Sequence, residues 1–160
     1  RNVDAKTSKN LIAAAGTTLP EISGKIIDGD IVNREALRGK LTLLAFWRSV
    51  NKESAQEMLE IKELYTKHKG DGFEVLAISF DKTPERWKSF IQQNSLHWIN
   101  VNDFLGSSSP NLDKFNNDRI PFYFLVGPDL KIKERDVRVS ELPIYLREHF
   151  KNKAVSASQK

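Results

Sequence analysis

The sequence predicts an α/β fold in which a central mixed β-sheet is covered by helices on both faces. Residues 41–47, LTLLAFW, carry no charge, and residues 73–80, FEVLAISF, are almost as apolar, which is typical of strands buried on both faces of a sheet. Helical patterns separate these runs. Buried strands that alternate with helices require right-handed crossovers and a sheet with two covered faces. Near the carboxyl end, residues 122–126 and 131–137 flank a Gly-Pro-Asp-Leu turn and predict a hairpin.

The transition that follows residues 41–47 organises the rest of the chain. Asn51 and Ser54 are both favourable N-cap residues, and Ser54 with Glu57 fits a capping box, so a helix should begin within 51–54. Its free amides and positive dipole end would then lie near the carboxyl end of a central strand. One helix stripe faces the sheet because apolar residues recur every three or four positions. These residues are Ala55, Met58, Ile61, Leu64 and Tyr65.

The other elements follow in chain order. Residues 25–32, KIIDGDIV, are two β runs around Asp28-Gly29, which favours a type I′ hairpin. The helices are expected to begin where a capping residue precedes proline. The remaining elements are a helical turn at 33–40, a helix from Thr83-Pro84, a strand at 97–103, a helix from Ser109-Pro110 and a closing helix at 140–150.

Composition narrows the function classes. The 160 residues carry 25 Lys and Arg against 21 Asp and Glu, a net charge of +4 that is spread in mixed-sign clusters. No basic stripe is present, so a nucleic-acid partner is not expected. The chain has no cysteine, which excludes disulfides and thiolate metal sites. No run reaches transmembrane length, and His68, His97 and His149 are scattered without metal-ligand spacing, so neither a membrane span nor a metal site is expected.

Length and patterning predict one domain. We expect an N-terminal arm or linker at 1–15, the α/β domain at 16–150 and a disordered C-terminal tail at 151–160. Because the chain starts at Arg1 without methionine or an apolar leader, we expect an excised or processed segment.

Several segments in the right order resemble one family. Phe46-Trp47, followed by positions 51 and 54 and then Glu57-Met58, is similar to the active-site segment of thioredoxin-like proteins of the TlpA/ResA type, which are related to AhpC/TSA proteins. Leu37-Arg38-Gly39-Lys40 matches the segment before that family's central strand. The resemblance covers residues 16–150. It implies a thioredoxin-like fold with an N-terminal β-hairpin and the inserted strand-helix element of TlpA-type proteins.

The sequence departs from the family at its chemistry. Asn51 and Ser54 stand where the family carries its Cys-x-x-Cys pair. Thiol-disulfide exchange needs a thiolate nucleophile and a second, resolving sulfur, so the oxidoreductase activity that the family implies is not expected and no catalytic residue is assigned. An enzyme built on Ser54 would need an adjacent base, and no histidine lies in the segment. No cofactor motif is present, so no cofactor is expected.

Ile120-Pro121 occupies the position of the family's cis-proline. In relatives, the residue before this proline pairs its backbone with an extended substrate peptide, so the resemblance implies a groove here. Phe122 departs from the small residue common after that proline, and we expect it to crowd the groove. The hypothetical ligand- or peptide-binding residues are Trp47, Asn51, Ser54, Ile120, Pro121 and Phe122. Trp47 could equally be core, and Asn51 could be only a helix cap. An anion near Arg48 and Lys52 is a further possibility, offset locally by Glu53 and Glu57.

Two interpretations follow. The first is a redox-inactive thioredoxin-like domain that binds an unknown protein or an extended peptide. The second is a purely structural terminal module of a larger exported thiol-disulfide oxidoreductase-like protein, packed on an upstream domain of the same full-length chain. The resemblance implies a bacterial, periplasmic or cell-envelope location, because TlpA-type relatives are usually exported or tethered outside the inner membrane.

Overall fold

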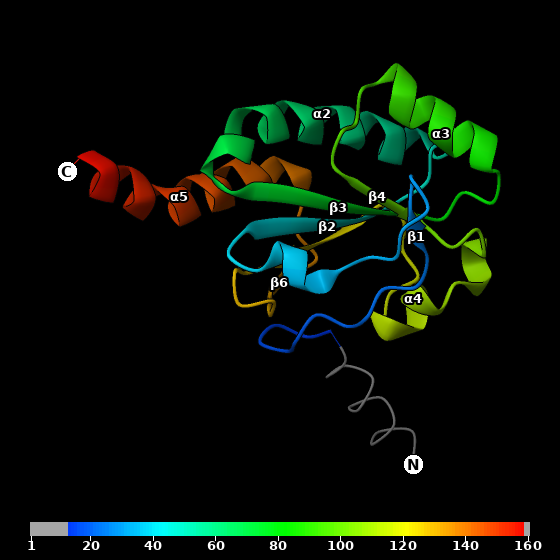
Figure 1. Ribbon diagram of the computed structural model, residues 1–160, viewed down its shortest axis with the longest axis horizontal. Helices are drawn as coiled ribbons and strands as arrows, with labels where there is room; N and C mark the ends of the chain where they lie inside the picture. The colour runs from blue at the N-terminus through cyan, green and yellow to red at the C-terminus, as the bar shows by residue number, and fades with distance from the viewer. Residues whose placement is uncertain (1–12, 159–160) are drawn as a thin grey trace, which may run out of the picture.

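A six-stranded sheet in the order β1-β4-β3-β2-β5-β6 runs through the middle of the molecule (Figure 1). The structure, a computed structural model, describes residues 13–158. Strands β2, β3 and β4 are parallel, whereas β1 pairs antiparallel with β4, β5 with β2 and β6 with β5. The strands are β1 (Lys25–Ile26), β2 (Leu41–Trp47), β3 (Phe73–Ser79), β4 (Ile99–Asn102), β5 (Phe122–Val126) and β6 (Ile132–Arg135).

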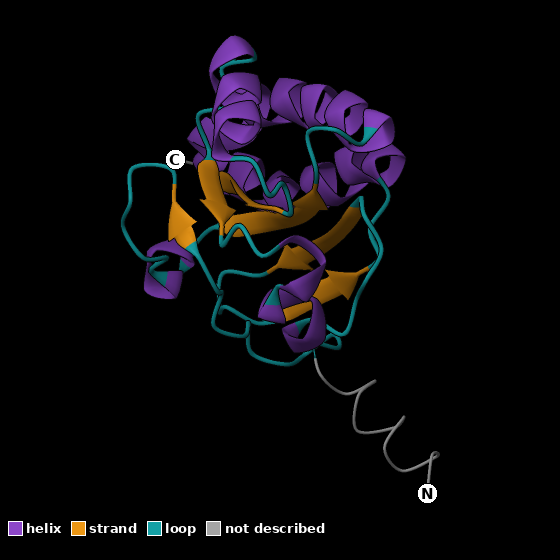
Figure 2. Cartoon of the chain, turned by 90° about the vertical axis from the view of Figure 1, so that its right-hand side faces the viewer, coloured by secondary structure: helices purple, strands orange, loops and turns teal. Residues whose placement is uncertain are grey.

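Helices of unequal length cover the two faces of the sheet. The long helices α2 (Lys52–His68), α3 (Pro84–Gln93) and α5 (Leu142–Ser158) lie on one face (Figures 1 and 2). The short helices η1 (Arg34–Leu37) and α4 (Pro110–Lys114) lie on the other with the N-terminal segment. Three further single turns are η2 (Lys69–Asp71), η3 (Gly106–Ser108) and η4 (Val139–Glu141). The mixed sheet with helices on both faces is therefore confirmed.

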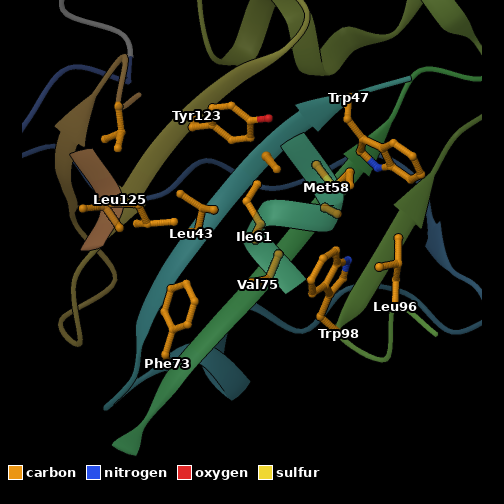
Figure 3. Packing of buried hydrophobic residues seen from close by; sticks show 14 of the residues in the cluster. Leu43, Trp47, Met58, Ile61, Phe73, Val75, Leu96, Trp98, Tyr123 and Leu125 are labelled. Atoms are coloured by element: carbon orange, nitrogen blue, oxygen red, sulfur yellow. The ribbon is translucent and has the colours of Figure 1, made fainter. Parts of the chain in front are cut away.

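Strand β2 forms the centre of both hydrophobic layers. All seven of its residues are buried. Because side chains alternate along a strand, Leu43 and Trp47 enter the layer under α2, while Leu44 and Phe46 enter the opposite layer. Figure 3 shows the first layer, with Ile61 and Met58 of α2 above the sheet. The prediction of a central strand from this uncharged run is confirmed. The strand is buried because helices and loops cover both faces of the sheet.

The turn at Asp28-Gly29 differs from the prediction. A type I′ turn needs positive φ at both central residues, but only Gly29, with φ of +100°, has it. The Gly29 amide donates to the Ile26 carbonyl at 2.9 Å, and the Ile26 amide donates to the Asp30 carbonyl at 2.8 Å. These bonds close a three-residue loop with glycine at its left-handed position, so Asp28 avoids a strained conformation.

Both ends of the expected domain extend further than the sequence boundaries placed them. Ala13 is buried in the layer opposite α2, and the Gly16 amide donates to the Ile132 carbonyl at 2.7 Å. Helix α5 continues to Ser158 and so includes most of the segment expected to be a disordered tail. Lysine and alanine in that segment favour helix. The rest of the arm, residues 1–12, and the last two residues lie outside the described part.

Candidate functional site

The start of α2 is built by Asn51. Its side-chain oxygen accepts a hydrogen bond from the Ser54 amide at 2.8 Å, and its carbonyl accepts from the Ala55 amide at 2.9 Å. Asn51 is the N-cap, as its extended φ and ψ of −85° and 117° require. The amide side chain is therefore already used by the helix, which confirms the capping role expected for this residue.

Ser54 is enclosed one turn further on. Ser54 is fully buried, and its hydroxyl oxygen has no hydrogen-bond partner among the described residues. A buried hydroxyl without a partner is unfavourable, whereas a thiol at the same place would lose little because it is a weak donor. The pocket around position 54 thus suits a side chain less polar than serine.

Trp47 belongs to the core. Its residue is fully buried, and its ring centroid lies 5.3 Å from that of Phe90 on α3. Figure 3 shows the indole at the end of β2, near Met58. Trp47 therefore packs in the core between the sheet and the helices α2 and α3. Of the two roles considered for this residue, the structure supports the core one.

The chain enters β5 through a cis peptide bond between Ile120 and Pro121. Strand alternation then sends consecutive side chains to opposite faces. The Phe122 ring turns toward the α4 side, where its centroid lies 5.1 Å from that of Phe124 and within 5.2 Å of the Arg135 guanidinium. Phe122 is only 4% exposed, and its ring packs in the hydrophobic layer on the face of the sheet opposite α2. The ring therefore does not crowd the α2 side, contrary to the expectation from the sequence.

Tyr123 points the other way, toward α2. Its hydroxyl donates a 2.8 Å hydrogen bond to a carboxylate oxygen of Glu57. Burial raises the pKa of Glu57, and repulsion from Glu53 and Glu60 raises it further. The hydrogen bond from Tyr123 acts in the opposite direction but is outweighed. The pKa of Tyr123 is also raised, first by burial and then by the negative charge of Glu57. The pair joins β5 to α2 at the site.

A groove of about 590 Å³ passes over this pair. It lies between α2, the start of β5 and the connection from β6 to α5. Carboxylates dominate its charge, with Arg138 as its one cation. Its acidic residues are Glu53, Glu57, Glu60, Glu63 and Asp136. We call this space the acidic groove.

The backbone amide and carbonyl of Ile120, the residue before Pro121, have no hydrogen-bond partner among the described residues. Among the described residues, no hydrogen bond outside the regular elements involves the Ile120 amide or carbonyl, and Ile120 lies outside β5. Polar backbone groups of this kind seek either water or another strand. The next residue, Pro121, lines the groove.

These observations coincide with a family comparison. Residues 39–132 match the model of a family described as thioredoxin-like. The chain belongs to this thioredoxin-like family. ResA of Bacillus cereus, a thiol-disulfide oxidoreductase, is 28% identical over 120 residues, which cover 75% of this chain and 68% of that protein.

Solved structures agree with the thioredoxin-like assignment. A thiol-disulfide oxidoreductase from Bacteroides fragilis has a TM-score of 0.75 and 30% identity, with 82% of this chain and 98% of that chain covered. The thioredoxin domain of a thiol-disulfide oxidoreductase from Bacteroides vulgatus has a TM-score of 0.76 and 25% identity, with coverage of 85% and 97%. The family and the fold expected from the sequence are therefore confirmed.

The thioredoxin-like sheet gathers the six predicted site residues at one end. Phe46 pairs with Phe122 across β2 and β5, so the end of β2, the start of α2 and the start of β5 lie together. Burial separates the six into two groups. Trp47, Ser54 and Phe122 are buried, whereas Asn51, Ile120 and Pro121 are partly exposed. Only the second group can meet a ligand without movement of the core.

A buried polar network that was not predicted from the sequence lies on the other side of α2. The Asp81 carboxylate accepts from the Ser49 amide and hydroxyl at 3.0 Å and from the Ser79 hydroxyl at 2.8 Å. The Asn102 side chain donates to the Asp81 carbonyl at 2.9 Å. The available signal was the polar residues at the carboxyl ends of three apolar strand patterns, which meet at one sheet edge when the strands are parallel. This network holds the loop that precedes Asn51.

Two negative observations apply to residues 13–158. None of their helices is both long enough and apolar enough to cross a membrane. No group of three or more acidic, histidine or cysteine side chains in this range is arranged to hold a metal ion.

Proposed function

We propose that this thioredoxin-like domain is a redox-inactive, TlpA-type binding module that takes an extended peptide or protein segment in the acidic groove. The unpaired amide and carbonyl of Ile120 carry the proposal, because an extended peptide can add to such groups as a further strand. The groove alongside provides room for alternate side chains of that strand.

The proposed function does not include thiol-disulfide exchange. Asn51 is engaged as a helix cap and Ser54 is enclosed. Neither an amide nor an unactivated hydroxyl attacks a disulfide. With no thiol in the 160 residues, what remains of the family's chemistry at this site is recognition.

The charge of the groove indicates the kind of peptide. Five carboxylates face one guanidinium there. Complementary charge raises both the association rate and the specificity. We therefore expect peptides with lysine or arginine at alternate positions to bind better than neutral or acidic ones.

Titration of the ¹⁵N-labelled chain with three extended peptides of basic, neutral and acidic composition tests the proposal. Amide shifts should concentrate at Ile120, Phe122, Glu57 and Val137 and should saturate for the basic peptide. The charge reversal Glu60→Lys, on the groove side of α2, should weaken this binding. Glu85→Lys, an equally exposed change on α3 outside the groove, is the control.

Absence of a saturable, localised shift with all three peptides would contradict the proposal. The purely structural role as a terminal module of a larger protein would then be the better account.

We also propose a periplasmic or cell-envelope location, which the family resemblance supports. Fractionation of the source cells with a compartment marker tests it. Recovery of the full-length protein only with the cytoplasmic marker would contradict it.

A further inference from the structure

We propose that this chain has a second ligand site, separate from the acidic groove, that binds the phosphate or carboxylate group of a small anionic molecule. The site is a cavity of about 620 Å³ on the α3 side of the α2 N-terminus. We call it the basic pocket. Its lining residues are Arg48, Val50, Phe80, Asp81, Lys82, Thr83, Arg86 and Ser107.

Three cations line the basic pocket and none of them is neutralised by an ion pair. Within residues 13–158, Arg48, Lys82 and Arg86 take part in no salt bridge and no side-chain hydrogen bond. The Nε atom of Arg48 is buried without a partner. A buried guanidinium nitrogen without an acceptor is costly. Arg48 as a whole is only partly buried and lines the pocket, so we expect its other N–H groups to donate to an oxyanion there.

The one carboxylate in the lining is already engaged elsewhere. Asp81 is 4% exposed. Its oxygens accept hydrogen bonds from the Ser49 amide and hydroxyl and from the Ser79 hydroxyl. Asp81 therefore reduces the net charge of the pocket to +2 (three cations and one anion) while it leaves all three cationic groups without an acceptor.

The stem of Lys82 passes close to the backbone of Gly106, beside the pocket-lining Ser107. A Cβ added to Gly106 would lie 2.6 Å from Cε and 3.0 Å from Cγ of Lys82. The lysine stem therefore lies directly over the glycine backbone.

The start of α3 adds neutral donors to the same wall. Its N-cap, Thr83, makes no side-chain capping bond, and Pro84 at the first helical position has no amide hydrogen. The free donors at the positive end of this ten-residue helix are therefore the amides of Glu85 and Arg86. Ser107 contributes a hydroxyl from η3. Glu85, also in the first turn, does not line the basic pocket but lines a neighbouring cavity that shares Val50 and Arg86 with it.

The location fits a ligand site in an open α/β sheet. Trp47 pairs with Ser79 at the carboxyl ends of the parallel strands β2 and β3, and the connections that follow these two strands supply most of the lining. Ligands in open parallel sheets bind in the crevice outside the carboxyl ends of the strands. The three unpaired cations thus converge from two strand connections and one helix.

The experiment is titration of the ¹⁵N-labelled chain with inorganic phosphate and, separately, with citrate, at constant ionic strength. Saturable shifts at the amides of Arg48, Lys82, Thr83, Arg86 and Ser107 are expected with at least one of the two anions. Phosphate as the tighter anion indicates a phosphorylated metabolite, and citrate as the tighter one indicates a polycarboxylate. Either result supports the proposal.

Matched variants distinguish a specific anion site from non-specific attraction of anions to a positively charged surface. Lys82→Gln and Arg86→Gln should each lower the affinity for the tighter-binding anion at least about tenfold, as expected for loss of a charged hydrogen bond. Lys88→Gln, an equally exposed change of the same charge on α3 outside the pocket, should stay within about twofold. The proposal is overturned if neither anion gives saturable shifts at these amides, or if Lys88→Gln weakens binding as much as Arg86→Gln does.

Discussion

The Tyr123 hydroxyl donates a 2.8 Å hydrogen bond to Glu57 and so joins β5 to the first half of α2. Tyr123→Phe removes only this donor. We expect it to lower the free energy of unfolding by about 1.5 kcal/mol, near the lower end for hydrogen bonds to charged groups. Urea unfolding followed by fluorescence measures the change. Tyr145→Phe is the control, because the Tyr145 hydroxyl has no hydrogen bond among the described residues, and an equal loss there would contradict the assignment.

Glu57→Gln should stabilise the chain at neutral pH. Because burial raises the pKa of Glu57 in the folded state, the folded chain holds this proton more tightly than the unfolded chain does. Stability from this group is full below its ordinary pKa of 4.5 and is lost as pH rises through the raised value. Glutamine keeps the acceptor for Tyr123 but cannot ionise.

The unfolding midpoints of wild type and Glu57→Gln should therefore coincide near about pH 3 and separate by about pH 7, with the variant more stable. Glu35→Gln provides the opposite sign. Arg38 lowers the pKa of Glu35 through a hydrogen bond, so this variant should be slightly less stable than wild type at neutral pH and equal to it in acid. A Glu57→Gln curve parallel to wild type at all pH values would argue against the raised pKa.

Asn51→Ala should destabilise the fold by about 0.5–2 kcal/mol through loss of the α2 cap. Asn51→Asp, which preserves the capping oxygen, should stay close to wild type. Chemical denaturation of the three proteins measures this. A stability unchanged in Asn51→Ala, accompanied by loss of peptide binding, would instead assign Asn51 to ligand contact.

Ser54→Ala should leave the chain as stable or make it more stable, by up to about 1 kcal/mol, because it removes a buried hydroxyl without a partner. Alanine also improves helix propensity, so Ser89→Ala on the exposed face of α3, where the hydroxyl accepts only an exposed 3.2 Å hydrogen bond from the Gln93 side chain, serves to subtract that contribution. A clear loss of stability in Ser54→Ala beyond the control would mean that the hydroxyl makes a stabilising bond in solution.

The sequence allowed the central features of the fold to be predicted because their causes are local. The run at residues 41–47 is apolar on both faces, and Asn51 precedes a helical stripe. The loop at Gly29 was predicted with the wrong number of residues, since asparagine-glycine and aspartate-glycine pairs also fit longer turns, in which glycine alone takes positive φ. Strand β1, which leads into this loop, pairs with β4, and its Lys25 lies opposite Asn102, 77 positions further along the chain.

The site was harder to predict because its contacts are between distant segments. Glu57 and Tyr123 are 66 positions apart, and Ser49 and Asp81 are 32 apart. No periodicity within one element reports such a contact. The burial of Trp47 likewise depends on α3, whose Phe90 ring packs against it. The six residues predicted from the sequence lie together at one end of the sheet, but which of their side chains remain accessible is decided by tertiary packing.

Strand β2 has hydrogen-bonded neighbours on both edges, with β3 paired along residues 41–47 and β5 along residues 42–46. Its amides can reach solvent only when one neighbouring strand detaches and both hydrophobic layers open. Their hydrogen exchange should therefore be among the slowest in the domain and should approach the rate of global unfolding. Asn51 follows this strand closely, whereas Ile120 follows the irregular segment after α4. The two sides of the proposed peptide site thus differ in local stability, and the Ile120 side is expected to be the one that adjusts to an incoming strand.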